Sequence, residues 1–303
     1  MNWIRKYKNW KILNEAGSRP PGRTRRSQPE MNTWQEDWAA SRSPKTSPKR
    51  LGELYDTHSD DLNFLDNLAI HPNTPPRILK LLSTKTVHHG ELVAKNKNAP
   101  ADVLDSLLGS ANEGTIANVA KNPNATVEIL EKIYSRPGSW KYHIWLASNI
   151  KCPTSILSKI SRVWRNNHDP DGTMLALLQN SNTSTEDLER LESEAGDWET
   201  NYEFQDALSN NQNASIDQLR RLSKSPDPYV RGGVANNPNA PIESIAGLLT
   251  DSDYWVKLNA RANLDKIKKE RPELRDKIER LENISELGIR GDEESPDLSE
   301  LDI

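Results

Sequence analysis

A short motif recurs along this chain at nearly constant spacing: an apolar residue, alanine, any residue, asparagine, any residue, asparagine, then alanine-proline or a close variant. Seven copies lie at 68–75, 93–100, 119–126, 146–153, 177–184, 208–215 and 234–241, and a degraded eighth copy lies at 258–265. Their first residues are separated by 25, 26, 27, 31, 31, 26 and 24 positions. Such a period is the signature of a stacked repeat array, and it constrains the fold more than any other feature.

Each period has room for two short helices, because about 25 residues cannot also hold a β-α-β crossover. After each asparagine pair, apolar residues recur at three- and four-residue spacing, as in Val103, Leu104, Leu107 and Leu108. This spacing places them on one helical face. The segment before each pair is expected to form a shorter second helix. We therefore predict an all-α fold: a right-handed α-solenoid of about seven to eight two-helix repeats of 24–31 residues, with disordered tails.

The paired asparagines are predicted to be structural. A loop packed against the next repeat has backbone groups that water cannot reach, and an asparagine amide carries both donors and an acceptor. The alternative is a ligand-binding role, since loops often carry function. The residues concerned are Asn96, Asn98, Asn122, Asn124, Asn180, Asn182, Asn211, Asn213, Asn237 and Asn239.

Two stretches carry a resemblance to a known family. VANNPNAPIESIAGLLTDSDYWVK (234–257) and VAKNPNATVEILEKI (119–133) resemble the leucine-rich repeat variant family, a HEAT-like α-solenoid. The resemblance covers about 60–264 and departs at the fourth copy, where Lys151 and Cys152 replace asparagine and alanine. It implies an extended curved surface that holds partners, without implying one chemistry.

The two ends of the chain differ from the array in charge. Residues 1–50 hold twelve Lys and Arg against four Asp and Glu, whereas 281–303 hold one Arg against eight acids. The stretches 18–30 and 41–50 have the composition of unfolded linkers. The predicted regions are therefore a basic, Trp-containing, Pro/Ser/Arg-rich and largely disordered segment (1–50), the repeat array (51–264), C-terminal capping helices (265–288) and an acidic disordered tail (289–303).

One segment inside the basic region has the form of a short docking motif. Thr33 and Glu36 have the spacing of a helix capping box, and Trp34 and Trp38 would share one helical face.

Composition favours a cytoplasmic protein. The single Cys152 cannot form an intrachain disulfide, and no apolar stretch is long enough for a signal peptide or a membrane span. Cys152 takes the alanine position of its repeat, where a small buried thiol fits.

Catalytic signals are absent from the sequence. The six histidines fall in different repeats or linkers, and none has the spacing of a helical zinc motif. The chain has no glycine-rich phosphate loop and no nucleophile elbow. We therefore expect no enzyme activity, no metal and no cofactor.

The longer periods place their extra residues in one position, between the second helix of one repeat and the first helix of the next. The insertions 136–140, 164–173 and 194–200 each carry a tryptophan, and in a solenoid they share one edge. Tryptophan is enriched at protein interfaces, so this edge is a candidate protein-binding surface formed by Trp140, Trp164, Trp198, Arg136 and Arg165. The alternative is that each indole packs over a joint between repeats. Trp145 and Trp255 are assigned to the core.

Two functions remain. The first is a non-enzymatic scaffold or adaptor that binds another protein along the repeat surface. The second is a nucleic-acid-associated solenoid, because the N-terminal region is basic and contains aromatic residues. The array is less suited to phosphate, since 60–264 carries a net charge of −5. The sequence does not predict an oligomeric state.

Overall fold

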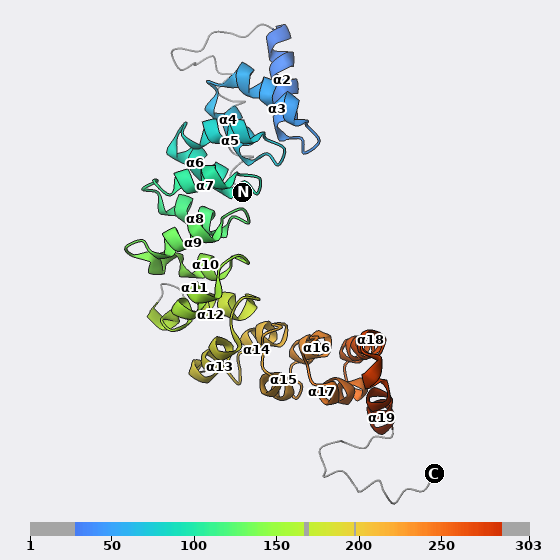
Figure 1. The fold of residues 1–303 in the computed structure, drawn as a ribbon. Helices are drawn as coiled ribbons and strands as arrows, with labels where there is room; N and C mark the ends of the chain where they lie inside the picture. The colour runs from blue at the N-terminus through green and yellow to red at the C-terminus, as the bar shows by residue number, and fades with distance from the viewer. Residues whose placement is uncertain (1–27, 167–169, 197, 287–303) are drawn as a thin grey trace, which may run out of the picture. The chain divides into compact units, whose positions relative to one another are not determined.

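The computed structural model describes residues 28–166, 170–196 and 198–286. Those residues form eighteen α-helices and four short 3₁₀-helices and contain no strand, which confirms the predicted all-α class (Figure 1). Their contacts divide the chain into two compact units, Met1–Ile78 and Leu79–Ile303. The division falls inside helix α5 (Pro76–Ser83).

The first unit contains α2 (Gln28–Arg42), α3 (Pro48–His58) and α4 (Leu62–Ile70), and α4 packs against both of the others. Trp34 stacks on Trp38 with ring centroids 5.1 Å apart, and Trp38 meets Phe64 edge-on at 5.8 Å. Both indoles are half-buried, so they form part of the fold of this unit. The proposed capping box of Thr33 and Glu36 begins no helix, because both residues lie inside α2.

The stretch 41–50, which the sequence predicted to be a linker, instead comprises the end of α2, a structured loop at 43–47 and the first residues of α3. His71 Nε2 hydrogen-bonds Ser43 O at 2.7 Å, and Asn73 Nδ2 donates to Pro44 O and Thr46 O, both at 3.0 Å. Leu51, which follows this loop, is fully buried. The predicted boundary at residue 50 therefore falls within α3.

The second unit continues with helices that alternate before and after each asparagine pair. In chain order they are α6 (Val87–Lys95), α7 (Ala101–Leu107), α8 (Glu113–Lys121), α9 (Val127–Tyr134), η1 (Ser139–Tyr142), α10 (His143–Ala147), α11 (Thr154–Ser161), η2 (Trp164–Asn166), α12 (Pro170–Gln179), α13 (Thr185–Glu194), α14 (Tyr202–Ser209), α15 (Ile216–Leu222), α16 (Pro228–Asn236), α17 (Ile242–Gly247), η3 (Leu248–Thr250), α18 (Tyr254–Glu270), η4 (Pro272–Leu274) and α19 (Arg275–Glu286).

The even-numbered helices of this unit pack against one another in sequence, from α6 against α8 to α16 against α18. In Figure 1, α14, α16 and α18 form one such row, with α15 and α17 on one side of it. Each odd-numbered helix from α7 to α17 buries an aliphatic residue eight positions after the first asparagine of its motif. These residues are fully buried: Leu104, Leu130, Leu157, Leu188, Leu219 and Ile245. The core thus repeats with the motif.

Buried asparagines link each loop to the loop before it. Asn211 is 4 % exposed, and its Nδ2 donates to Leu178 O at 2.7 Å and to Asn180 O at 3.1 Å. Its Oδ1 accepts the backbone N–H of Asn213 at 2.9 Å. The same pattern of two donated bonds holds for Asn122, Asn149, Asn180, Asn211, Asn237 and Asn263, which we call the asparagine ladder. These bonds confirm that the asparagine pairs fix the loops.

The second asparagine of each pair acts closer to the surface. Asn182 Nδ2 donates to Ile150 O at 2.8 Å and to Cys152 O at 3.1 Å. In the fourth copy this asparagine is replaced by Lys151, whose backbone N–H still donates to Asn149 Oδ1 at 2.9 Å. The substitution therefore keeps the turn and removes the amide donor.

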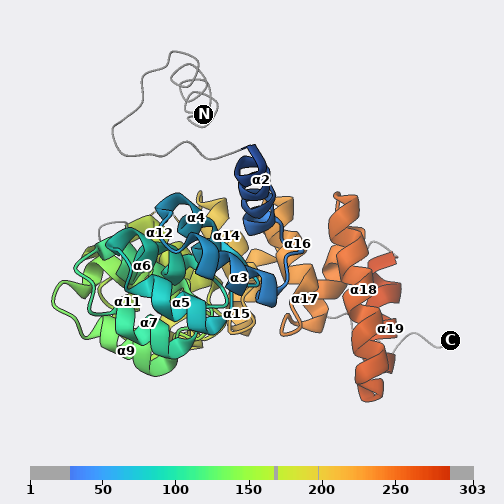
Figure 2. The same ribbon diagram turned by 90° about the horizontal axis from the view of Figure 1, so that it is seen from above.

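The C-terminal end of the unit differs from the other repeats. Asn263 donates to Ala235 O and Asn237 O, which is the bonding of a first asparagine, so the eighth copy lies two positions later than the sequence placed it. No loop follows Asn263, because α18 continues to Glu270; the predicted boundary at 264 falls inside this helix. Beyond it, α19 packs against α17 and α18, and Figure 2 shows α18 and α19 side by side. Ile278 of α19 is fully buried.

Candidate protein-binding surface

Exposed aromatic residues gather at the N-terminal ends of three helices that pack side by side. Tyr229 is 77 % exposed, Tyr254 75 % and Trp255 61 %. They are joined by Tyr202 at the start of α14 and by Leu258 one turn into α18, both also exposed. We call Tyr202, Tyr229, Tyr254, Trp255 and Leu258 the aromatic strip.

The position of these residues follows from how the helices begin. Asp227 caps α16 by accepting the backbone N–H of Tyr229 at 2.7 Å, and Asp253 caps α18 by accepting that of Trp255 at 2.8 Å. The caps place both aromatic residues in a first helical turn. Tyr229 and Trp255 lie eight positions before their ladder asparagines, Asn237 and Asn263, so they correspond to each other in the repeat.

The strip crosses the contact between α16 and α18. A β-carbon on Gly232 would lie 3.9 Å from Trp255 Cδ1, so one edge of the indole rests on α16 at this glycine. Gly232 follows Tyr229 by three residues and therefore lies near it on the helix surface. On the other side of α16, a β-carbon on Gly233 would overlap Ser209 Oγ of α14. The two glycines thus let α16 approach both neighbours closely.

Carboxylates border the strip. Asp206 of α14 is half-buried; burial raises its pKa, and the negative charge of Asp227 raises the pKa further, against a hydrogen bond from Asn210 that lowers it. Arg231 forms a two-pronged ion pair with Asp251, at 2.6 and 2.9 Å. This hydrogen-bonded partner raises the pKa of Arg231, with smaller contributions from Asp253 and Asp227. The carboxylate of Asp227 therefore acts on a titratable group of α14 and on one of α16.

The insertion edge predicted from the sequence contains tryptophans in three different environments. Trp140 in η1 is 44 % exposed, and Lys141 Nζ lies 5.9 Å from its ring centroid. Trp164 in η2 is only 6 % exposed, and its Nε1 donates to Glu194 Oε2 at 3.1 Å. Trp198 is half-buried. Trp164 therefore packs over a joint between repeats, as the alternative interpretation holds, whereas Trp140 is accessible.

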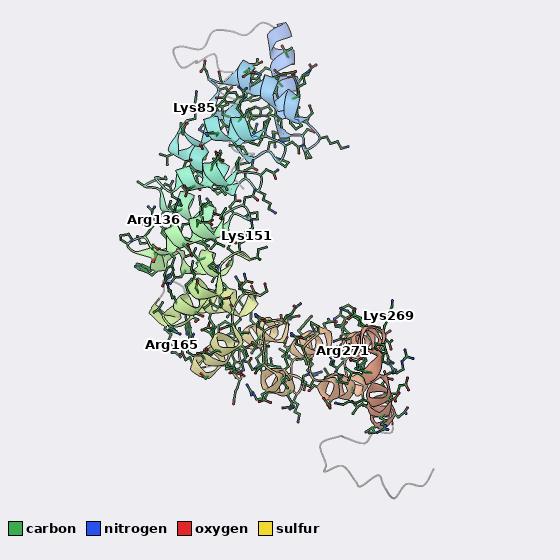
Figure 3. All side chains as sticks on the ribbon, viewed as in Figure 1. Lys85, Arg136, Lys151, Arg165, Lys269 and Arg271 are labelled. Atoms are coloured by element: carbon green, nitrogen blue, oxygen red, sulfur yellow. The ribbon has the colours of Figure 1, made fainter. Side chains whose placement is uncertain are left out.

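The two arginines of that edge also differ. Arg136 Nη1 donates to Leu108 O at 2.7 Å, which ties it to the end of the preceding repeat. Arg165 is exposed, with its guanidinium 4.9 Å from the Trp164 ring centroid. Figure 3 shows both arginines on one side of the second unit and Lys151 on the other. Trp164 and Arg136 thus make contacts within the fold, whereas Arg165 is accessible.

Sequence reasoning missed the aromatic strip and assigned Trp255 to the core, which the structure contradicts. The detectable signal was positional. Tyr202 and Tyr254 precede their ladder asparagines by nine residues, and Tyr229 and Trp255 precede theirs by eight. Trp140 also lies nine residues before Asn149, which places it in the same register, two even-numbered helices away from α14.

Other chemically notable groups lie inside the fold. Cys152 is fully buried, and burial raises its pKa to about 12. Asp187 is 2 % exposed; burial alone would raise its pKa, but hydrogen bonds from Ser158, Ser184, Arg190 and Ser161 lower it overall. Within the described ranges, no group of three histidine, cysteine or acidic side chains is arranged to hold a metal. No helix in this part of the chain is long and apolar enough to cross a membrane.

Comparison with known proteins finds no matching family model, curated protein or solved structure.

Proposed function

We propose that this chain is a non-enzymatic protein-binding scaffold, built as a right-handed α-solenoid that resembles the leucine-rich repeat variant family, and that the aromatic strip is its main binding surface. The solenoid arrangement is supported by the even-numbered helices, which pack in sequence, and by the asparagine ladder, which joins successive loops. The number of repeats, about seven to eight, follows from the motif copies.

The observation that carries the proposal is the exposure of Tyr229, Tyr254 and Trp255 on adjacent helices. Large aromatic side chains exposed on neighbouring helices mark interaction sites, because leaving them in water is unfavourable. Tyrosine and tryptophan are also the residues that dominate binding energy at protein interfaces. Under this proposal Trp140 is a secondary contact in the same register, and Trp164 and Arg136 support the fold.

The non-enzymatic part of the proposal is supported by what the buried polar groups do. Asn211 bonds loop carbonyls, and Asp187 is surrounded by the hydroxyls of Ser158, Ser161 and Ser184. Each of these groups satisfies other protein groups, which is a structural role.

The test is a comparative capture from the native host. Immobilised wild-type chain is compared with the double variant Tyr229→Ser, Trp255→Ser, and with the control Ile150→Ser, which alters an exposed residue in the loop between α10 and α11. We expect the wild type and the control to retain the same proteins and the double variant to lose them, as measured by quantitative mass spectrometry. Identical retention by all three would contradict the proposal. Salt-sensitive capture of DNA that the double variant preserves would favour the nucleic-acid alternative.

A further inference from the structure

The aromatic strip has a regular geometry that constrains its ligand. Each of three packed helices, α14, α16 and α18, presents a tyrosine or tryptophan from its first turn. Packed helices lie about 8–10 Å apart, and small residues at the contact favour the short end of this range. Gly232 and Gly233 lie at these two contacts. The aromatic residues therefore recur along the strip at roughly 8–10 Å.

One peptide conformation repeats at the same distance. A polyproline II helix has three residues per turn and a rise of about 3.1 Å per residue, so one face returns about every 9 Å. A proline-rich segment laid across the three helices would then place one turn over each aromatic position. Proline-rich segments dock in this way on aromatic surfaces, and their preformed conformation reduces the entropy lost on binding.

The charge of the strip selects among such segments. Glu203, Asp206, Asp227 and Asp253 border the aromatic residues, and all four are at least partly exposed. Arg231 and Asp251 neutralise each other, with side chains only 13 % and 6 % exposed. The nearest cations outside that pair, Lys224, Lys257 and Arg261, number three against these four carboxylates, so the border stays net negative. An acidic border is complementary to a basic ligand.

We propose that the aromatic strip binds a basic, proline-rich segment of a partner protein in the polyproline II conformation. The inference rests on the proposed scaffold function and names the class of its partner. Proline rings pack on Trp255, Tyr229 and Tyr202, and the tyrosine hydroxyls donate to carbonyls of the peptide, which has no internal hydrogen bonds. Arginines between the prolines meet the carboxylates of Asp227 and Asp253.

The test uses a fluorescent nine-residue peptide of three Arg-Pro-Pro units and measures its anisotropy with the full chain. One control peptide replaces the prolines by alanine and keeps the charge. A second replaces the arginines by glutamate and keeps the prolines. We expect the Arg-Pro-Pro peptide to bind about tenfold or more tightly than either control.

Two variants locate the site. Trp255→Ala and Tyr229→Ala are each expected to weaken peptide binding about tenfold or more, as for other aromatic hot spots. The control Ile150→Ala changes a residue that is 71 % exposed in a loop distant from the strip in sequence, and it should alter binding less than about twofold. Unchanged melting midpoints by circular dichroism show that each variant is folded.

Several results would overturn the inference: no binding of the Arg-Pro-Pro peptide, equal binding of the alanine peptide, stronger binding of the glutamate peptide, or unchanged binding by Trp255→Ala.

Residues 18–29 of this chain, SRPPGRTRRSQP, are themselves basic and proline-containing, like the proposed ligand. If the peptide binds only after Pro20→Ala and Pro21→Ala are introduced, this segment of the chain itself occupies the aromatic strip. That result would contradict the proposal of a partner protein. If the peptide fails but host proteins are still lost with the double variant, the scaffold function stands and this inference does not.

Discussion

The two edges of the second unit are built by different rules. On the loop edge, the asparagine ladder makes the same two bonds at every step from Asn122 to Asn263. On the insertion edge, Trp140 is accessible, Trp164 is buried and Trp198 lies between them in exposure. Backbone carbonyls are present in every loop whatever its sequence, so bonding to them can repeat. Insertions of different length cannot repeat a side-chain contact.

The largest expected effect is on the insertion edge. Trp164→Ala should destabilise the fold by about 3–5 kcal/mol, because it removes a buried aromatic side chain. Trp140→Ala is the matched control on the same edge and should change stability by less than about 0.5 kcal/mol, because its side chain is already exposed. Chemical denaturation measures both. Equal losses would mean that the two insertions play the same structural role.

A smaller effect is expected on the loop edge, where two adjacent asparagines provide the comparison. Asn211→Ala removes three hydrogen bonds from a buried loop and should cost about 2–3 kcal/mol. Asn210→Ala removes bonds within its own helix at an exposed position and should cost less than about 0.5 kcal/mol. Similar denaturation midpoints for the two variants would refute the buried role of the ladder.

The smallest effect at neutral pH concerns Cys152, in a loop that has lost its second asparagine. Its pKa is raised from 9.0 to about 12, so its contribution to stability is complete below pH 9 and is lost as the pH rises toward 12. Cys152→Ala restores the usual residue of this position. The wild type should lose roughly 1–3 kcal/mol relative to that variant between pH 8 and pH 11. Parallel curves of unfolding free energy against pH for the two proteins would show that folding does not raise the pKa of the Cys152 thiol.

The sequence was sufficient for the parts of the fold that depend on periodicity. The apolar spacing predicted helices, and the asparagine pairs predicted loops whose amides satisfy backbone groups, because both signals recur and are local. The first loop was missed because Ser43 and Lys45 stand where later copies have asparagine, and its Pro/Ser/Arg composition is typical of linkers. There the bond to the preceding loop is made by His71.

The candidate site was less predictable. Whether Trp255 is buried depends on which neighbour covers the first turn of α18, and Gly232 covers only one edge of its indole. The environment of Trp164 likewise depends on Glu194, thirty residues away. Exposure at these positions is set by contacts between repeats, which the pattern within one repeat does not contain.

The ladder has a direction. Every side-chain amide of the ladder donates to backbone carbonyls of the preceding loop, so each loop provides the acceptors for the asparagine of the next loop. This series of acceptors ends after Asn263, because α18 continues to Glu270. The next ladder asparagine would need the carbonyls of residues 261 and 263, but within a continuous helix these accept N–H groups of their own helix. A further ladder asparagine would therefore find no free carbonyl at these two positions, so the ladder ends within α18.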